Sequence, residues 1–168
     1  MTMRRMLPAD VTHLVLHTTA GRRDADADAI RRYHVEHRGW ADIGYHYVVL
    51  DSGEAQAGRS SNRQGAHALG FNDCSLGVAM VGHHDHHRPS PAQWDTTIDL
   101  LALLCYRYDV PTRRVIGHRE TGAPKTCPGE MVDMAIVRIM VADRVDELSS
   151  PLVRAGHPLI QLTGGVRW

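Results

Sequence analysis

The sequence has no net charge, no long apolar run, few cysteines and almost no lysine. In its 168 residues, 19 Lys and Arg are balanced by 19 Asp and Glu, whereas nucleic-acid-binding proteins usually carry a basic excess. No segment approaches the roughly 20 consecutive apolar residues that span a bilayer, and residues 1–11 lack the apolar stretch of a signal peptide. We therefore expect no nucleic-acid partner, no membrane insertion and a cytoplasmic protein.

The few cysteines and the one lysine carry further information. Cys74, Cys105 and Cys127 include no close pair, which argues against a disulfide framework and favours reduced thiols. Cys105 falls on a helix face, where a cysteine is usually a small buried apolar residue. Lys125 is the only lysine among 19 basic residues, so it is a candidate for a role that Arg cannot fill.

Hydrophobic periodicity and turn residues predict strands that alternate with helices. Ser90, Pro91 and Gln93 are typical of an N-cap, a first helical position and a capping box, respectively. Such alternation indicates a single α/β domain with a central mixed β-sheet flanked by helices. The predicted strands are residues 11–17, 45–50, 54–58, 76–81 and 114–117, and the predicted helices are 27–37, 90–108 and 131–145.

Three side chains at or after strand ends have metal-ligand chemistry. His17 closes one predicted strand, His118 follows another, and Cys127 lies nine residues after His118 in a Pro-flanked loop. Two imidazoles and a thiolate form a three-ligand zinc site with a fourth position for water. On spacing alone, a histidine at a strand end is more often a satisfied polar residue than a metal ligand.

Several motifs occur together in one order along the chain. They read HTTAG, GWADIGYHY, GAHALGFN, GHRE and APKTCP, and they cover residues 17–21, 39–47, 65–72, 117–120 and 123–128. Together they resemble the zinc-dependent N-acetylmuramoyl-L-alanine amidases, which include phage lysozyme-type amidases and peptidoglycan recognition proteins. The resemblance implies a central sheet flanked by helices, one catalytic zinc in a surface groove, and cleavage of the amide between N-acetylmuramic acid and L-alanine.

The resemblance also implies roles for five residues. His17, His118 and Cys127 match the metal ligands of the family, and one Zn²⁺ per chain is expected. Tyr45 occupies the position of the catalytic tyrosine. Lys125 stands two residues before the cysteine ligand, where phage amidases have their catalytic lysine. A tyrosine hydroxyl and a lysine ammonium are suited to stabilise an oxyanion or to relay a proton to the leaving amine.

Other polar residues have two readings each. Glu120 is either a general base or a partner in a salt bridge or hydrogen bond near a ligand. His67 and Asn72 either contact substrate or support the site, and Trp40 either stacks on a sugar or fills the core. The run of four histidines and one aspartate at residues 83–87 predicts an exposed loop that binds metal adventitiously and is dispensable for activity.

These observations predict an amidase of peptidoglycan or soluble muropeptides. We expect a monomeric catalytic domain at residues 1–148 and a C-terminal tail of unknown role at 149–168. A phage endolysin that reaches the cell wall after release is the first interpretation, and a host amidase that recycles muropeptides is the second. A noncatalytic peptidoglycan-binding module is a third, although binders commonly lack the cysteine ligand. Metal storage by the histidine-rich loop would require several zinc ions per chain.

Overall fold

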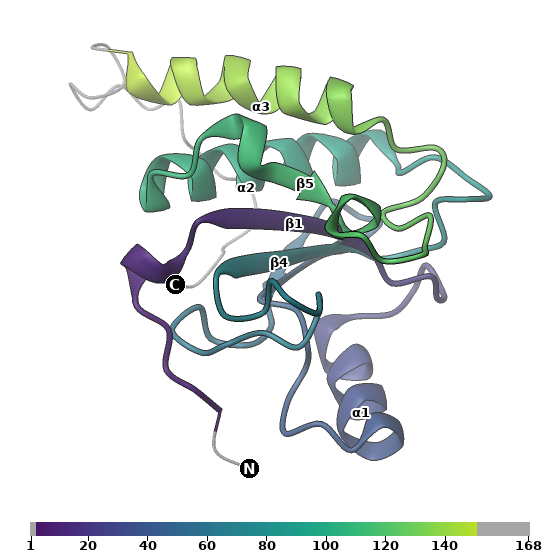
Figure 1. Ribbon diagram of the computed structural model, residues 1–168. Helices are drawn as coiled ribbons and strands as arrows, with labels where there is room; N and C mark the ends of the chain where they lie inside the picture. The colour runs from purple at the N-terminus through teal and green to yellow at the C-terminus, as the bar shows by residue number, and fades with distance from the viewer. Residues whose placement is uncertain (1–2, 151–168) are drawn as a thin grey trace.

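The computed structural model describes residues 3–150, which fold around one five-stranded sheet (Figure 1). The strand order is β3-β2-β4-β1-β5. The β2–β3 pair is a short antiparallel hairpin, and every other neighbouring pair is parallel. The predicted mixed sheet is therefore confirmed. The strands are β1 (His13–Thr18), β2 (Tyr47–Val49), β3 (Ala55–Ala57), β4 (Ser75–Met80) and β5 (Val115–Gly117).

The central strands β1 and β4 are buried because both faces of the sheet are covered. All six residues of β4 and five of the six in β1 are buried, as expected for parallel strands with layers on both faces. The two strands pair in register from His13 opposite Ser75 to Thr18 opposite Met80. Both strands therefore end together at one edge of the sheet.

Helices cover the two faces unequally. The helices α2 (Pro91–Tyr108) and α3 (Met134–Ser149) lie on one side of the sheet, and α1 (Ala27–Arg38) lies on the other (Figure 1). The larger core lies between the sheet and α2 with α3. A smaller apolar cluster under α1 contains Ile30 and Ile43.

Each long helix begins at a side-chain cap. Asp26, Ser90 and Asp133 accept hydrogen bonds from backbone N–H groups in the first turns of α1, α2 and α3. The predicted capping-box role of Gln93 is wrong. Its side chain is fully buried and donates to the carbonyls of Val49 and Val81, so it ties the ends of β2 and β4 to α2.

The chain also contains three short 3₁₀ helices, which are η1 (Pro8–Asp10), η2 (Thr112–Arg114) and η3 (His118–Thr121).

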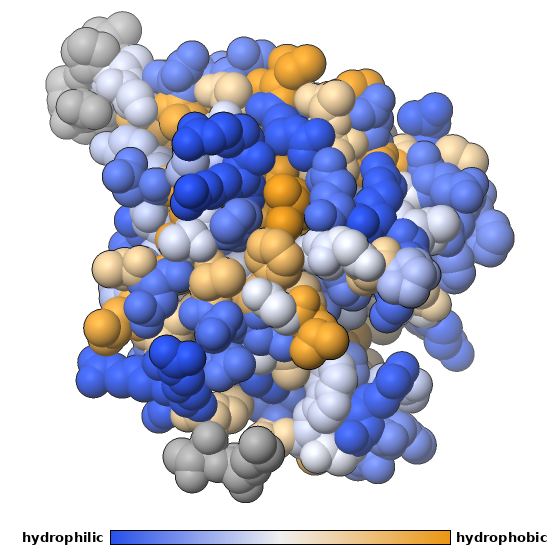
Figure 2. Space-filling model, in the orientation of Figure 1, coloured by the Kyte–Doolittle hydropathy of each residue, from blue (hydrophilic) through white to orange (hydrophobic). Residues whose placement is uncertain are grey.

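The visible face is mostly hydrophilic, with small separate apolar patches (Figure 2). Among residues 3–150, no helix is long and apolar enough to cross a membrane. The helix α3 ends at Ser149, close to the expected end of the catalytic domain, and the predicted tail lies outside the described residues beyond residue 150.

Candidate active site

Two histidines meet because neighbouring parallel strands end at the same edge of the sheet. His17 lies near the carboxyl end of β1, and His118 follows β5 directly. The strands pair with Leu16 opposite Gly117, which places the two imidazole rings 4.6 Å apart between centroids. The predicted pair of strand-end histidines is therefore brought together.

The loop between η3 and α3 adds the third donor. One potential ligand atom each from His17, His118 and Cys127 lies within 4.8 Å of the other two. The Cys127 Sγ atom is 3.7 Å from His17 Nδ1. A tetrahedral zinc ion with ordinary bond lengths would separate such N and S donors by about 3.5 Å. The donor set and its spacing therefore fit one zinc ion.

Burial sets the protonation of these donors. It lowers the pKa of His17 and of His118, and the Lys125 ammonium lowers both pKa values further. Both rings are therefore neutral at physiological pH, which is the ligand form. Burial also raises the pKa of the Cys127 thiol to about 11, although the Thr18 N–H, 3.3 Å from Sγ, opposes this shift. A divalent cation would supply the positive charge that a thiolate needs here.

Tyr45 lies beside this cluster. Its ring centroid is 5.2 Å from that of His17, and its backbone carbonyl accepts a hydrogen bond from the Arg59 N–H. Burial, followed by the nearby Cys127, raises the pKa of Tyr45. The phenol therefore keeps its proton at physiological pH and can donate a hydrogen bond toward the donor cluster.

Lys125 lies on the same loop as Cys127 and is exposed. Its ammonium lies close enough to the cluster to lower the pKa of all three donors. The structure thus brings a neutral hydroxyl and an ammonium to the same donor cluster.

Sequence comparison agrees with this geometry. The model of the N-acetylmuramoyl-L-alanine amidase family matches residues 7–130. The chain belongs to this family. The predicted family and the predicted enzyme class, an amidase, are both confirmed.

Relatives of the amidase come from animals and phages. Peptidoglycan-recognition protein SC2 of Drosophila simulans is 31% identical over 136 residues, which are 76% of this chain and 73% of that protein. The endolysin of Escherichia phage T7 is 38% identical over 104 residues, or 59% of this chain and 66% of the endolysin. The solved structure of the Ph2119 endolysin from a Thermus scotoductus bacteriophage has a TM-score of 0.71 at 28% identity, and the match covers 83% of this chain and 89% of the other.

His67 and Asn72, the two residues expected either to contact substrate or to support the site, form hydrogen bonds next to His17. His67 is only 8% exposed, and its Nδ1 lies 3.0 Å from His17 Nε2. Since His17 Nδ1 faces Cys127, we assign the ring hydrogen of His17 to Nε2, which donates to His67. The Asn72 Oδ1 accepts from the backbone N–H groups of His67 and Ala68. These contacts show that both residues support His17, and direct contact of either residue with substrate stays a prediction.

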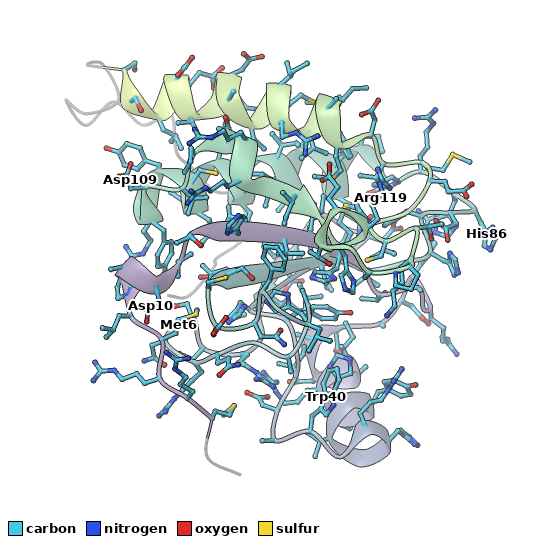
Figure 3. All side chains as sticks on the ribbon, in the orientation of Figure 1. Met6, Asp10, Trp40, His86, Asp109 and Arg119 are labelled. Atoms are coloured by element: carbon cyan, nitrogen blue, oxygen red, sulfur yellow. The ribbon has the colours of Figure 1, made fainter. Side chains whose placement is uncertain are left out.

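Trp40 and Glu120 have other partners in the structure. Trp40 lies near α1 (Figure 3). Its ring centroid is 4.6 Å from that of His34, which in turn is 5.5 Å from that of Tyr45. Glu120 accepts from the Gly117 N–H at 2.7 Å and forms a salt bridge with Arg138 of α3 at 3.1 Å. The predicted salt bridge of Glu120 is therefore present, and a general-base role stays a prediction.

The histidine-rich loop after β4 is not the exposed loop that was predicted. His84 is 0% exposed, and its Nδ1 lies 3.1 Å from the carbonyl oxygen of His87, whereas His86 is exposed at the edge of the amidase (Figure 3). Among residues 3–150, the zinc-type cluster described above is the one group of three converging donors. The prediction of exposure is wrong for His84 because this part of the loop packs against the Cys127 loop, and dispensability for activity stays a prediction.

The contact between His67 and His17 was not predictable from the sequence. The two residues are 50 positions apart, and their meeting depends on close backbone approach. A Cβ atom on Gly77 would lie 2.6 Å from His67 Cγ, so the glycine in β4 makes room for the ring. Gly65, where a Cβ atom would lie 2.4 Å from His67 Cδ2, makes room on another side of the same ring.

Proposed function

We propose that this chain is a zinc-dependent N-acetylmuramoyl-L-alanine amidase that hydrolyses the bond between N-acetylmuramic acid and L-alanine in peptidoglycan. The observation that carries the proposal is the convergence of His17, His118 and Cys127 within 4.8 Å. A zinc ion bound there would act as a Lewis acid that polarises the scissile carbonyl and makes hydroxide available near neutral pH. We propose one such ion per chain.

Tyr45 and Lys125 would act on the reacting amide. The oxyanion that develops on the carbonyl oxygen needs hydrogen-bond donors aimed at it. The Tyr45 hydroxyl, which keeps its proton because burial raises its pKa, is one such donor. The Lys125 ammonium is the second, and it can pass a proton from Nζ to the departing amine of L-alanine. Arg could not make this transfer because its guanidinium does not deprotonate.

We further propose that the enzyme serves as a phage endolysin. The similarity to the T7 endolysin supports this role, in which a monomer made in the host cytoplasm acts on the wall after release. A host amidase for soluble muropeptides is the second candidate. The similarity to a peptidoglycan-recognition protein permits a binding-only role. Catalysis is favoured because the third donor is a thiol, which a carbohydrate-binding surface does not require.

Mass spectrometry of digested cell wall tests the proposal. The wild-type protein should release free L-alanine amino termini without new reducing sugars and should hold one zinc. Cys127→Ser should lose both properties because it removes the soft ligand. Cys74→Ser is the matched control, since Cys74 is also a partly buried free cysteine and should leave both properties intact.

Each alternative gives a different result. A Cys127→Ser protein with stoichiometric zinc and full activity would refute the metal assignment. Retention on sacculi without release of amino termini would indicate a binding module. Cleavage of soluble muropeptides but not of intact sacculi would favour the recycling amidase over the endolysin.

A further inference from the structure

The three potential zinc ligands, His17, His118 and Cys127, are held in place by different parts of the structure. His17 lies in β1 and His118 directly follows β5, but Cys127 lies in the irregular segment between η3 and α3. Its carbonyl accepts the Arg119 N–H at 2.7 Å, and the Gly129 N–H closes a turn onto the Thr126 carbonyl at 2.9 Å. The position of the thiol therefore depends on what holds the residues around it.

The Arg119 side chain holds this loop from the side of η3 (Figure 3). Its guanidinium donates to the carbonyls of Thr126 and Gly129 at 3.0 and 2.9 Å, and to that of Val132 at 2.6 Å. One side chain thus joins three backbone positions on both sides of Cys127. Because Arg119 directly follows His118, the segment η3 carries one potential ligand and also holds the loop of Cys127.

The Asp85 carboxylate holds the loop from the histidine-rich segment after β4. Its Oδ2 accepts from the Thr126 hydroxyl at 2.7 Å, and its Oδ1 accepts from the Glu130 N–H at 2.9 Å. Beside it, the Met131 N–H donates to the His84 carbonyl at 3.0 Å. These contacts bridge more than 40 residues of sequence and reach the loop on either side of Cys127.

The backbone is shaped for this contact. Gly129 has φ 122°, and a Cβ atom there would lie 2.5 Å from the His84 carbonyl carbon. A side chain at Gly129 would therefore push the two loops apart. The fully buried His84 ring lies on the other side of the same contact.

We propose that Asp85 and Arg119 are positioning residues that hold Cys127 at the metal site by bracing its loop through side-chain hydrogen bonds. Asp85 acts on Thr126 and Glu130, and Arg119 acts on three carbonyls. The histidine-rich loop is thereby a support of the catalytic centre. The inference rests on the proposed function, because it concerns the ligand of the proposed zinc ion.

Zinc affinity, measured on the full chain by competition with a chromophoric chelator, tests the role of Asp85. Asp85→Ala should weaken zinc binding roughly 10-fold, the lower end of the effect of losing a residue that supports a ligand. Asp85→Asn should recover most of the affinity, because its amide oxygen can still accept the Glu130 N–H. Asp95→Ala, which removes an exposed carboxylate from α2, should bind zinc like the wild type.

The Asn variant separates positioning from charge. If Asp85 acted only by attracting the cation, Asn would be as weak as Ala, and that result would overturn the inference. Wild-type affinity in Asp85→Ala would overturn it as well. If Asp85→Ala does not fold, Thr126→Ala decides, because it removes one of the two donors to Asp85. We expect it to weaken zinc binding several-fold, and unchanged binding would overturn the inference.

Arg119→Lys tests the positioning role of Arg119. It keeps the charge but cannot reach three separate carbonyls with one ammonium, so zinc binding should weaken. Arg32→Lys on the exposed side of α1 is its control. Unchanged affinity in Arg119→Lys would overturn the role of Arg119.

Cys127→Ser separates failure of this inference from failure of the proposed function. If that variant loses zinc while Asp85→Ala and Arg119→Lys bind it normally, the positioning roles of Asp85 and Arg119 are refuted and the proposed metal site is retained. If Cys127→Ser binds zinc as tightly as the wild type, the proposed metal site is refuted, and the positioning roles of Asp85 and Arg119 are refuted with it.

Discussion

Acid should destabilise the protein through a buried histidine that takes no part in metal binding. His46 is 1% exposed, its Nδ1 accepts from the Gly77 N–H at 2.9 Å, and its Nε2 donates to the Arg63 carbonyl at 3.0 Å. A proton on Nδ1 would break the first of these bonds. Burial, assisted by the charge of Arg59, lowers the pKa of His46 to about 4, even though the Arg63 carbonyl opposes the shift.

The size of the effect follows from linkage. Between about pH 6.5 and pH 4 the unfolded chain carries the proton on residue 46 and the folded chain does not. The free energy of unfolding therefore falls as the pH falls through this window, whereas above it neither state is charged. With a folded pKa of about 4 and an unfolded pKa of about 6.5, lowering the pH from 7 to 5 removes about 2 kcal/mol.

The assay is urea denaturation at pH 7 and pH 5 in the presence of a chelator, so that metal binding does not contribute. His46→Asn is the comparison, because its amide oxygen can accept the Gly77 N–H but cannot titrate. The variant should be less stable at pH 7, since the Arg63 carbonyl loses its donor. Its loss of stability between the two pH values should be smaller than that of the wild type by about 2 kcal/mol. Equal losses in both proteins would refute the reasoning, as would an NMR titration midpoint of His46 near 6.5.

Other expected outcomes concern the reacting groups. Tyr45→Phe should keep zinc and lower kcat by roughly 100- to 1,000-fold, the usual effect of losing one oxyanion donor; an unchanged kcat with full zinc content would make Tyr45 structural. Lys125→Arg and Lys125→Ala should both lose most turnover at unchanged zinc content, and an active Arg variant would exclude proton transfer from Lys125. Glu120→Gln should leave kcat within a few-fold and lower stability by up to about 1 kcal/mol, because Glu120 contributes a partly exposed ion pair with Arg138. A large fall in kcat would instead support a general-base role of Glu120.

The sequence predicted best what depends on chain order and strand ends. The apolar run before His17 and the short strand before His118 place both imidazoles at one edge of a parallel sheet, and the motifs supplied Cys127 as the third donor. These features are local: a buried strand reads as an apolar run, and a ligand at its end follows from the strand direction.

The errors lie where tertiary contacts decide. The histidine-rich run reads as exposed because its residues are polar, yet His84 is buried by a contact with a loop some 45 residues later that Gly129 permits. Gln93 occupies a capping-box position, but its side chain turns inward to bond two strand carbonyls. In both cases a distant partner decides: the Met131 N–H bonds the backbone carbonyl of His84, and the carbonyls of Val49 and Val81 accept from the Gln93 side chain.

The three donors of the site are held by different kinds of structure. Strand ends fix the two neutral imidazoles, whereas the thiol, whose pKa burial raises to about 11, lies on a loop. An ionisable ligand on a loop needs both a cation to stabilise the thiolate and contacts that keep the loop in place when no cation is bound. Asp85 and Arg119 supply such contacts through hydrogen bonds that do not involve the sulfur. At the proposed zinc site, the loop can keep the same conformation with a neutral thiol or a thiolate, so zinc binding would require loss of the thiol proton but little rearrangement of the backbone.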